Sequence, residues 1–137
     1  MLTVFVCICI LLAGHCIGDY PMQGEFLAIN KSKDKVCLLA HCIIYTFFFT
    51  IAELATMLIH GFPIFMEIVV YIILIGLVTH LIIDKWKCSY RDRIMEELES
   101  GAITKEKMHE NDVLGFYIDQ ALHIFVMLVL YASLIFI

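Results

Sequence analysis

Four long apolar runs, separated by short polar stretches, dominate this chain and extend over residues 2–18, 36–59, 64–83 and 113–137. Each run has about 20 residues, the length that an α-helix needs to cross a ~30 Å hydrocarbon layer. Hydrophobic residues make up 62% of the chain, above the roughly 45–50% that is usual for soluble domains. The runs predict a single all-α integral membrane domain over 1–137, a four-helix bundle with helices at about 2–19, 36–59, 64–84 and 113–137.

The polar connections contain residues that end helices. Pro21 follows the first run, and proline lacks the backbone N–H that a helix interior needs. The next residues mix apolar and polar side chains, which is typical of a short segment lying at a membrane interface. The longest polar stretch extends from Lys85 to Asp112, and its first half can form an amphipathic helix that Gly101 ends. We therefore expect a cytoplasmic helical loop between the third and fourth helices.

All nine Lys and Arg residues lie in two connections, one after the first run and one after the third. The positive-inside rule predicts that both basic loops are cytoplasmic and that both termini lie outside. We expect a protein of the inner, cytoplasmic membrane. A cleaved signal peptide in place of the first helix would leave three spans and is an alternative, although no Lys or Arg precedes that run.

Histidine and aspartate recur four residues apart in three pairs, which are His15 with Asp19, His80 with Asp84, and Asp119 with His123. Residues four apart lie on one helix face, one turn from each other. The alternating topology brings all three pairs and His41 to one depth, on the cytoplasmic side. An aspartate at the centre of a membrane helix costs about 2.5–3.5 kcal/mol to insert. Three such pairs at one depth therefore predict a shared site.

Histidine nitrogens and aspartate oxygens are ligands of Zn²⁺, and also of Mn²⁺ or Fe²⁺. We predict a site for one or two divalent ions, with Zn²⁺ as the first candidate. The predicted ligands are His15, Asp19, His41, His80, Asp84, Asp119 and His123. Such an ion activates water for attack on a phosphoester, ester or amide, with Asp84 or Asp19 as general base. Tyr45 is the predicted donor to the oxyanion, and Gln23 and Lys87 are predicted to bind substrate.

Several of these residues have plainer interpretations. A hydrogen-bonded network without metal is the alternative for the three pairs, and a packed core histidine is the alternative for His41. Tyr45 and Gln23 could instead anchor or pack helices. Glu53 is interpreted as solvated near the outer side or paired with the exposed turn. The six cysteines form no C-x-x-C motif and are interpreted as small buried apolar residues. Cys42 is disfavoured as a ligand because it points about 100° away from His41 on a helix.

The polar residues form an ordered set of motifs: His15-x-x-Gly18-Asp19-x-x-x-Gln23, Asn30-Lys31, His41-x-x-x-Tyr45, His80-x-x-x-Asp84-x-x-Lys87 and Asp119-Gln120-x-x-His123. This set resembles a small family of bacterial and phage integral membrane proteins, domain of unknown function 3307. The resemblance covers most of the chain except about 91–112. It implies a small membrane protein without an established activity. The motifs are also distantly similar to membrane-bound metal-dependent hydrolases.

Three classes of function are consistent with these features. The first is an intramembrane metal-dependent hydrolase acting on a lipid or lipid-linked substrate near the cytoplasmic leaflet, so membrane lipid is the expected partner. The second is a transporter that handles metal ions or protons, although no polar stripe continues to the outer side. The third is a non-enzymatic membrane interaction protein of phage or bacterial origin. A homo-oligomer is compatible with all three, and the few basic residues argue against nucleic-acid binding.

Overall fold

Five α-helices make up the part of the chain that the computed structural model describes, residues 2–22, 24–62 and 65–135. They are α1 (Leu2–Asp19), α2 (Gly24–Asn30), α3 (Lys35–His60), α4 (Met66–Glu99) and α5 (Lys105–Ile135). These described residues include no strand, so the all-α prediction is confirmed. Within the same residues, α1, α3, α4 and α5 are long and apolar enough to cross a membrane.

The surface of the long helices is suited to lipid. Large apolar side chains lie outward on several helices, and Phe47, Leu74 and Phe125 are each at least half exposed. Extended exposed apolar surface is rare on soluble monomers and is normal where a helix faces hydrocarbon. This surface and the four long apolar helices suggest a membrane protein, and membrane insertion, orientation and the kind of membrane stay predictions.

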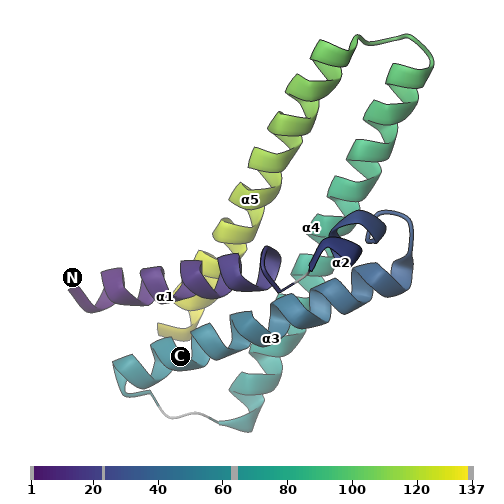
Figure 1. Ribbon diagram of the computed structural model, residues 1–137. Helices are drawn as coiled ribbons and strands as arrows, with labels where there is room; N and C mark the ends of the chain where they lie inside the picture. The colour runs from purple at the N-terminus through teal and green to yellow at the C-terminus, as the bar shows by residue number, and fades with distance from the viewer. Residues whose placement is uncertain (1, 23, 63–64, 136–137) are drawn as a thin grey trace.

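The last two long helices reach further than the sequence predicts. α4 continues through the polar stretch to Glu99, and α5 begins at Lys105 instead of near residue 113. The expected helical loop is thus formed by two helix extensions and a turn at Gly101, whose φ of 75° lies in the left-handed region. The polar stretch stays helical because Lys, Arg, Glu, Met and Leu, which are good helix formers, predominate in it. In Figure 1 the two extensions run side by side, away from the other helices.

α3 is the central helix of the fold. It packs against α1, α2 and α4, while α5 packs mainly against α4 and also contacts α1. In Figure 1, α1 and α3 lie alongside each other and cross the pair formed by α4 and α5. A buried apolar core of Leu11, Phe49, Ile72 and Met127 connects these four helices. The polar residues of the chain meet where the two pairs cross.

Two glycines allow α1 to approach α3 closely. A Cβ atom on Gly14 would lie 2.5 Å from the Cβ of Ala52, and one on Gly18 would lie 3.1 Å from the Cα of Tyr45. The contact at Gly14 leaves no room for a larger residue, so this packing requires glycine there, whereas a Cβ atom on Gly18 would force its neighbour to shift slightly. The close approach brings the end of α1 onto the middle of α3.

α2 and the start of α3 bring basic residues to the same region. α2 is the short helix expected after the first run, and it packs against α3. Asp34 caps α3 because its side chain accepts a hydrogen bond from the Val36 N–H at 2.8 Å. The tight connection between the two helices holds Lys31 close to the helix crossing.

Candidate metal centre

The seven residues predicted as metal ligands come together at the helix crossing, and no more than 5% of any of them is exposed. They come from all four long helices: His15 and Asp19 from α1, His41 from α3, His80 and Asp84 from α4, and Asp119 and His123 from α5. Residues from distant parts of the sequence therefore form one buried polar layer.

Four polar atoms surround the Nε2 atom of His41, and three of them belong to predicted ligands. Asp84 Oδ2 lies 2.9 Å from it, and Asp19 Oδ1 lies 3.3 Å from it. His80 Nε2 lies 3.0 Å away. One imidazole nitrogen carries at most one hydrogen, so hydrogen bonding does not account for three such neighbours. Ligand atoms around a tetrahedral Zn²⁺ lie about 3.3–3.6 Å apart. The three distances from His41 Nε2 are similar to this separation or slightly shorter. Asp19, His41 and His80 accordingly form a group that could hold a metal ion.

A second group adjoins the first through Asp84. Ligand atoms of Asp84, Asp119 and His123 lie within 4.8 Å of one another. His123 Nδ1 lies 3.0 Å from the backbone oxygen of Asp119 and donates to it, which leaves Nε2 as a free acceptor. That Nε2 and Asp119 Oδ1 are buried and have no hydrogen-bond partner among the described residues. A histidine held by a backbone carbonyl at one nitrogen commonly binds metal through the other.

Cys42 also reaches this site. It is fully buried, and its sulfur groups with His80 and Asp84 as a third set that could hold a metal ion. Cys42 was disfavoured from the sequence because, on α3 taken alone, its side chain points away from that of His41. Since α4 crosses α3 here, His80 and Asp84 lie close to both His41 and Cys42. Thiolate, imidazole and carboxylate together are ligands that suit Zn²⁺.

His15 belongs to none of these groups because both of its ring nitrogens are engaged. Nδ1 accepts a hydrogen bond from the Tyr45 hydroxyl at 3.2 Å, and Nε2 donates to Gln120 Oε1 at 3.0 Å. The amide nitrogen of Gln120 then donates to Asp19 Oδ2 at 3.1 Å and to Asp119 Oδ2 at 3.0 Å. His15 in this arrangement orients Gln120, which connects a carboxylate from each of the two principal groups.

Tyr45 packs directly on a predicted ligand. Its ring stacks on that of His80, with ring centroids 3.6 Å apart and planes 9° apart. Its hydroxyl is held by His15. These contacts fix the plane of His80, and the predicted oxyanion role of Tyr45 stays a prediction.

Two lysines bring positive charge to the carboxylates. Lys31 Nζ lies 3.2 Å from Asp84 Oδ2 and 3.1 Å from His41 Nε2. Lys87 Nζ lies 2.6 Å from Asp119 Oδ2. Lys87, predicted to bind substrate, is thus an ion-pair partner of a predicted ligand. Gln23 lies outside the described residues, so its predicted role stays a prediction.

The sequence predicted no part in the site for Lys31 and Gln120, and it disfavoured Cys42 as a ligand. Lys31 and Gln120 stood only as members of the motifs. The signal that could have found Gln120 is its position next to Asp119, at the depth of the polar layer. Lys31 gave a weaker signal, because a lysine in a basic loop is explained by topology alone.

Glu53 does not have the solvated position expected from the sequence. It is fully buried in α3, and neither carboxylate oxygen has a hydrogen-bond partner among the described residues. That expectation is wrong because α1 covers this part of α3, where Gly14 packs against Ala52. Glu53 therefore forms a second buried acidic position, separate from the polar layer at the helix crossing.

Comparison with protein families identifies the relatives of this chain. The model of a family described as "Protein of unknown function (DUF3307)" matches residues 7–137. The chain belongs to this family. The match confirms the resemblance and continues through residues 91–112, where the motifs are sparse. No curated protein matches the chain, and neither does any solved structure. The distant similarity to membrane-bound hydrolases stays a hypothesis.

Proposed function

We propose that this protein is an intramembrane metal-dependent hydrolase acting on a lipid or lipid-linked substrate. One observation carries the proposal: Asp84 lies between two groups of buried ligands. Its Oδ2 is 2.9 Å from His41 Nε2 on one side. On the other side it groups with Asp119 and His123. A carboxylate shared in this way is a common feature of two-metal hydrolytic centres.

The charges of the layer favour a bound cation. Three aspartates face two lysines there, Lys31 and Lys87, so carboxylates outnumber ammonium groups. His123 Nε2 and Asp119 Oδ1 are buried acceptors without partners among the described residues. Leaving such groups unpaired costs about 1–3 kcal/mol each. A divalent ion would satisfy both and would supply activation of water and stabilisation of developing negative charge.

The hydrogen bonds around Asp19 favour it as the general base, which leaves His41, His80 and Asp84 to hold the adjacent ion. Asp84 would be occupied by metal on both sides, and the Asp119 carboxylate is paired with Lys87. Asp19 Oδ2 accepts a hydrogen bond from Gln120, which fixes the carboxylate and directs Oδ1 toward the ligands. A carboxylate with fixed orientation at hydrogen-bond distance from the reacting water is suited to accept its proton.

Metal analysis of the protein purified in mild detergent tests this proposal. After incubation with Zn²⁺ and dialysis at neutral pH, we expect about one to two ions per chain. His80→Ala and Asp84→Ala should each lose at least about half of this metal with unchanged helix content. His109→Ala, an exposed histidine in α5, is the matched control and should keep it. Protein that retains no metal under these conditions would refute the proposal.

Activity provides the second measurement. We expect the metal-loaded protein to release a water-soluble product from a total lipid extract, and we expect His80→Ala to release none. The His109→Ala control should match the unmodified protein. Release that is equal with and without the chelator EDTA would argue against a metal-dependent reaction.

Glu53 supports a second candidate, a transporter of metal ions or protons. The sequence argument against transport was that no polar stripe continues to the outer side. Glu53 and Thr56, buried in the same helix as His41, extend polar groups in that direction. Flux of Zn²⁺ or protons into proteoliposomes that persists in a hydrolysis-dead variant would favour this function over the first.

A further inference from the structure

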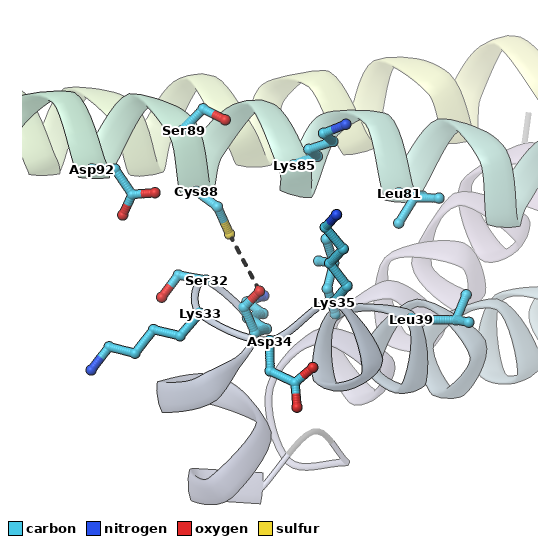
Figure 2. Close-up of a pocket in the computed structure, with 12 residues that line it drawn as sticks. Ser32, Lys33, Asp34, Lys35, Leu39, Leu81, Lys85, Cys88, Ser89 and Asp92 are labelled. Carbon is cyan, nitrogen blue, oxygen red and sulfur yellow. Dashed lines mark hydrogen bonds between the residues drawn. The ribbon is translucent and has the colours of Figure 1, made fainter.

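A groove of about 500 Å³ runs beside the candidate metal centre, between the α2–α3 connection and α4. One wall is formed by residues 31–35 with Leu38 and Leu39, and the other by Leu81, Lys85, Cys88, Ser89 and Asp92. Figure 2 shows the two walls facing each other, with Lys35 extending from α3 toward α4. The groove is therefore lined by residues that the candidate centre does not use, apart from Lys31.

The chemistry of the groove changes along its length. Its lining includes four lysines, Lys31, Lys33, Lys35 and Lys85, and three leucines, Leu38, Leu39 and Leu81. Figure 2 shows Leu39 and Leu81 at one end of the groove, with Lys35 and Lys85 next to them and Lys33 farther away. The lysines outnumber the two acidic residues, Asp34 and Asp92. Asp34 is also engaged in capping α3, where it accepts hydrogen bonds from Val36 N and Cys37 Sγ. The leucines continue the groove toward the apolar parts of α3 and α4, so it is apolar at that end and basic beside it.

Lys31 connects this groove to the metal ligands. Among the described residues, it alone both lines the groove and bonds to predicted ligands, through the 3.2 Å contact with Asp84 and the 3.1 Å contact with His41. A divalent ion held by those two ligands would repel an ammonium group so close to it. Metal binding would therefore move the Lys31 ammonium outward, into the groove.

We infer that this groove binds the phosphate of an anionic lipid, and that phosphate-bearing lipids are the substrate class of the metal centre. This inference rests on the proposed function. Several ammonium groups favour a ligand with more than one negative charge, and lysines near a membrane surface attract anionic headgroups. The leucines provide a surface for the start of the acyl chains. A lipid in this position has its phosphate beside Lys31 and thus next to the ligand layer.

The reaction that follows is hydrolysis of a phosphoester. The water oxygen bonds to phosphorus, the ester P–O bond breaks, and the water proton passes through Asp19 to the leaving oxygen. Positive charge from Lys31 and Lys35 would stabilise the negative charge that develops on the phosphate oxygens.

Binding measurements with short-chain lipids test the inference on the full chain in detergent. The probes are dilauroyl phosphatidic acid, dilauroyl glycerol with the same acyl chains, and inorganic phosphate. We expect phosphatidic acid to bind at least about tenfold more tightly than either other probe, since it alone matches both the basic and the apolar part of the groove. Equal binding of dilauroyl glycerol, or equal binding of inorganic phosphate, would overturn the assignment to a phosphate-bearing lipid.

A pair of double variants assigns the binding to the groove. Lys35→Met with Lys85→Met should weaken phosphatidic acid binding by about tenfold or more. Lys105→Met with Lys107→Met makes the same change of charge at the far end of the α4–α5 hairpin and should change it less than about twofold. All four lysines are exposed, so helix content should be unchanged in both proteins. An equal loss in both variants, or no loss in the first, would overturn the inference.

Metal content of the same samples separates this inference from the proposed function. Bound metal without any preference for phosphatidic acid would overturn the groove assignment and leave the metal centre standing. A preference for phosphatidic acid that depends on Lys35 and Lys85, in protein that binds no metal, would keep the lipid site and overturn its link to hydrolysis.

Discussion

The surroundings of Asp84 and Glu53 differ sharply, although both carboxylates are almost fully buried. Asp84 Oδ2 has the His41 ring nitrogen at 2.9 Å and the Lys31 ammonium at 3.2 Å. Glu53 has no hydrogen-bond partner among the described residues and lies about 18 Å further along α3 than His41, at 1.5 Å per residue. Burial alone therefore does not distinguish the candidate metal centre from other buried acidic positions. The convergence of possible ligands from several helices does.

The cause of the difference is where the helices cross. Near Asp84 all four long helices meet, and Gly18 lets α1 lie against Tyr45. At Ala52, next to Glu53 in the sequence, the close neighbour on α1 is Gly14, which has no side chain to offer. An unpaired buried charge is far more costly than a paired one. Four predictions test whether the two regions have the separate roles that these surroundings indicate.

Asp84→Asn should have the largest effect, because it keeps the side-chain shape but removes the charge that both ligand groups share. We expect loss of most bound metal. We also expect a fall of about 3–5 kcal/mol in the free energy of unfolding, since Lys31 loses its buried partner. Metal analysis and thermal unfolding in detergent measure the two effects.

The matched control for that variant is Asp112→Asn, which changes an exposed aspartate in α5 whose nearest ion-pair contact, to Arg91, is 3.9 Å long. Exposed pairs contribute little, so we expect its stability to change by less than about 1 kcal/mol. Full metal content in Asp84→Asn would contradict the idea of a shared carboxylate.

The buried polar layer could be predicted from the sequence because the prediction needs only two rules. Helical periodicity puts residues four apart on one face, and the distribution of basic residues sets the depth of each pair. His80 with Asp84 and Asp119 with His123 follow from these rules, and the structure brings both pairs together. The resemblance to the family also indicated that these motifs belong together as one ordered set.

The sequence did not predict which atoms meet, since that depends on how the helices cross. The hydrogen bonds of Gln120 with His15 and Asp19 join residues more than 100 positions apart. The burial of Glu53 depends on α1 covering α3, and the approach of Cys42 to Asp84 depends on α4 crossing α3. Each of these features arises from tertiary packing, which periodicity and charge do not determine.

Gln120→Ala should weaken metal binding without removing it. The variant loses the amide that holds Asp19 and Asp119, and it leaves His15 Nε2 without its acceptor. Loss of a group that orients metal ligands typically costs about 10–100-fold in affinity. Titration of apo protein with Zn²⁺ against a competing chelator measures the change.

Gln120→Met is the control that separates hydrogen bonding from packing. Methionine has a similar volume but has no amide donor. We expect Gln120→Met to bind Zn²⁺ as weakly as Gln120→Ala does. Affinity restored by Gln120→Met would mean that the glutamine only fills space.

Gly14→Ala should act on the Glu53 region more than on the metal centre. The added methyl group would meet Ala52 at 2.5 Å, so α1 must move away from α3. Overpacking of this kind costs about 1–3 kcal/mol, measured as a lower thermal midpoint in detergent. Cys16→Ala alters an exposed position on the same helix and should change stability by less than about 0.5 kcal/mol. If Gly14→Ala instead lost its bound metal while its thermal midpoint stayed unchanged, the Glu53 region and the metal centre would be coupled.

Glu53→Gln should have the smallest effect of the four. The change replaces a carboxyl group, which burial without a partner favours in its neutral form, by an amide of nearly the same shape, and no hydrogen bond among the described residues is lost with it. Stability should change by less than about 0.5 kcal/mol, and metal content should equal that of the unmodified protein. Thermal unfolding and metal analysis, run beside Asp84→Asn, provide the direct comparison.

The same variant separates hydrolysis from transport. If the protein is a hydrolase, product release by Glu53→Gln should be unchanged, because the carboxylate lies about 18 Å from His41 along α3. If Glu53 instead carries protons or metal ions, flux into proteoliposomes should fall while the metal content stays full. A fall in metal content would contradict both expectations, since it would require Glu53 to act on ligands that it does not contact among the described residues.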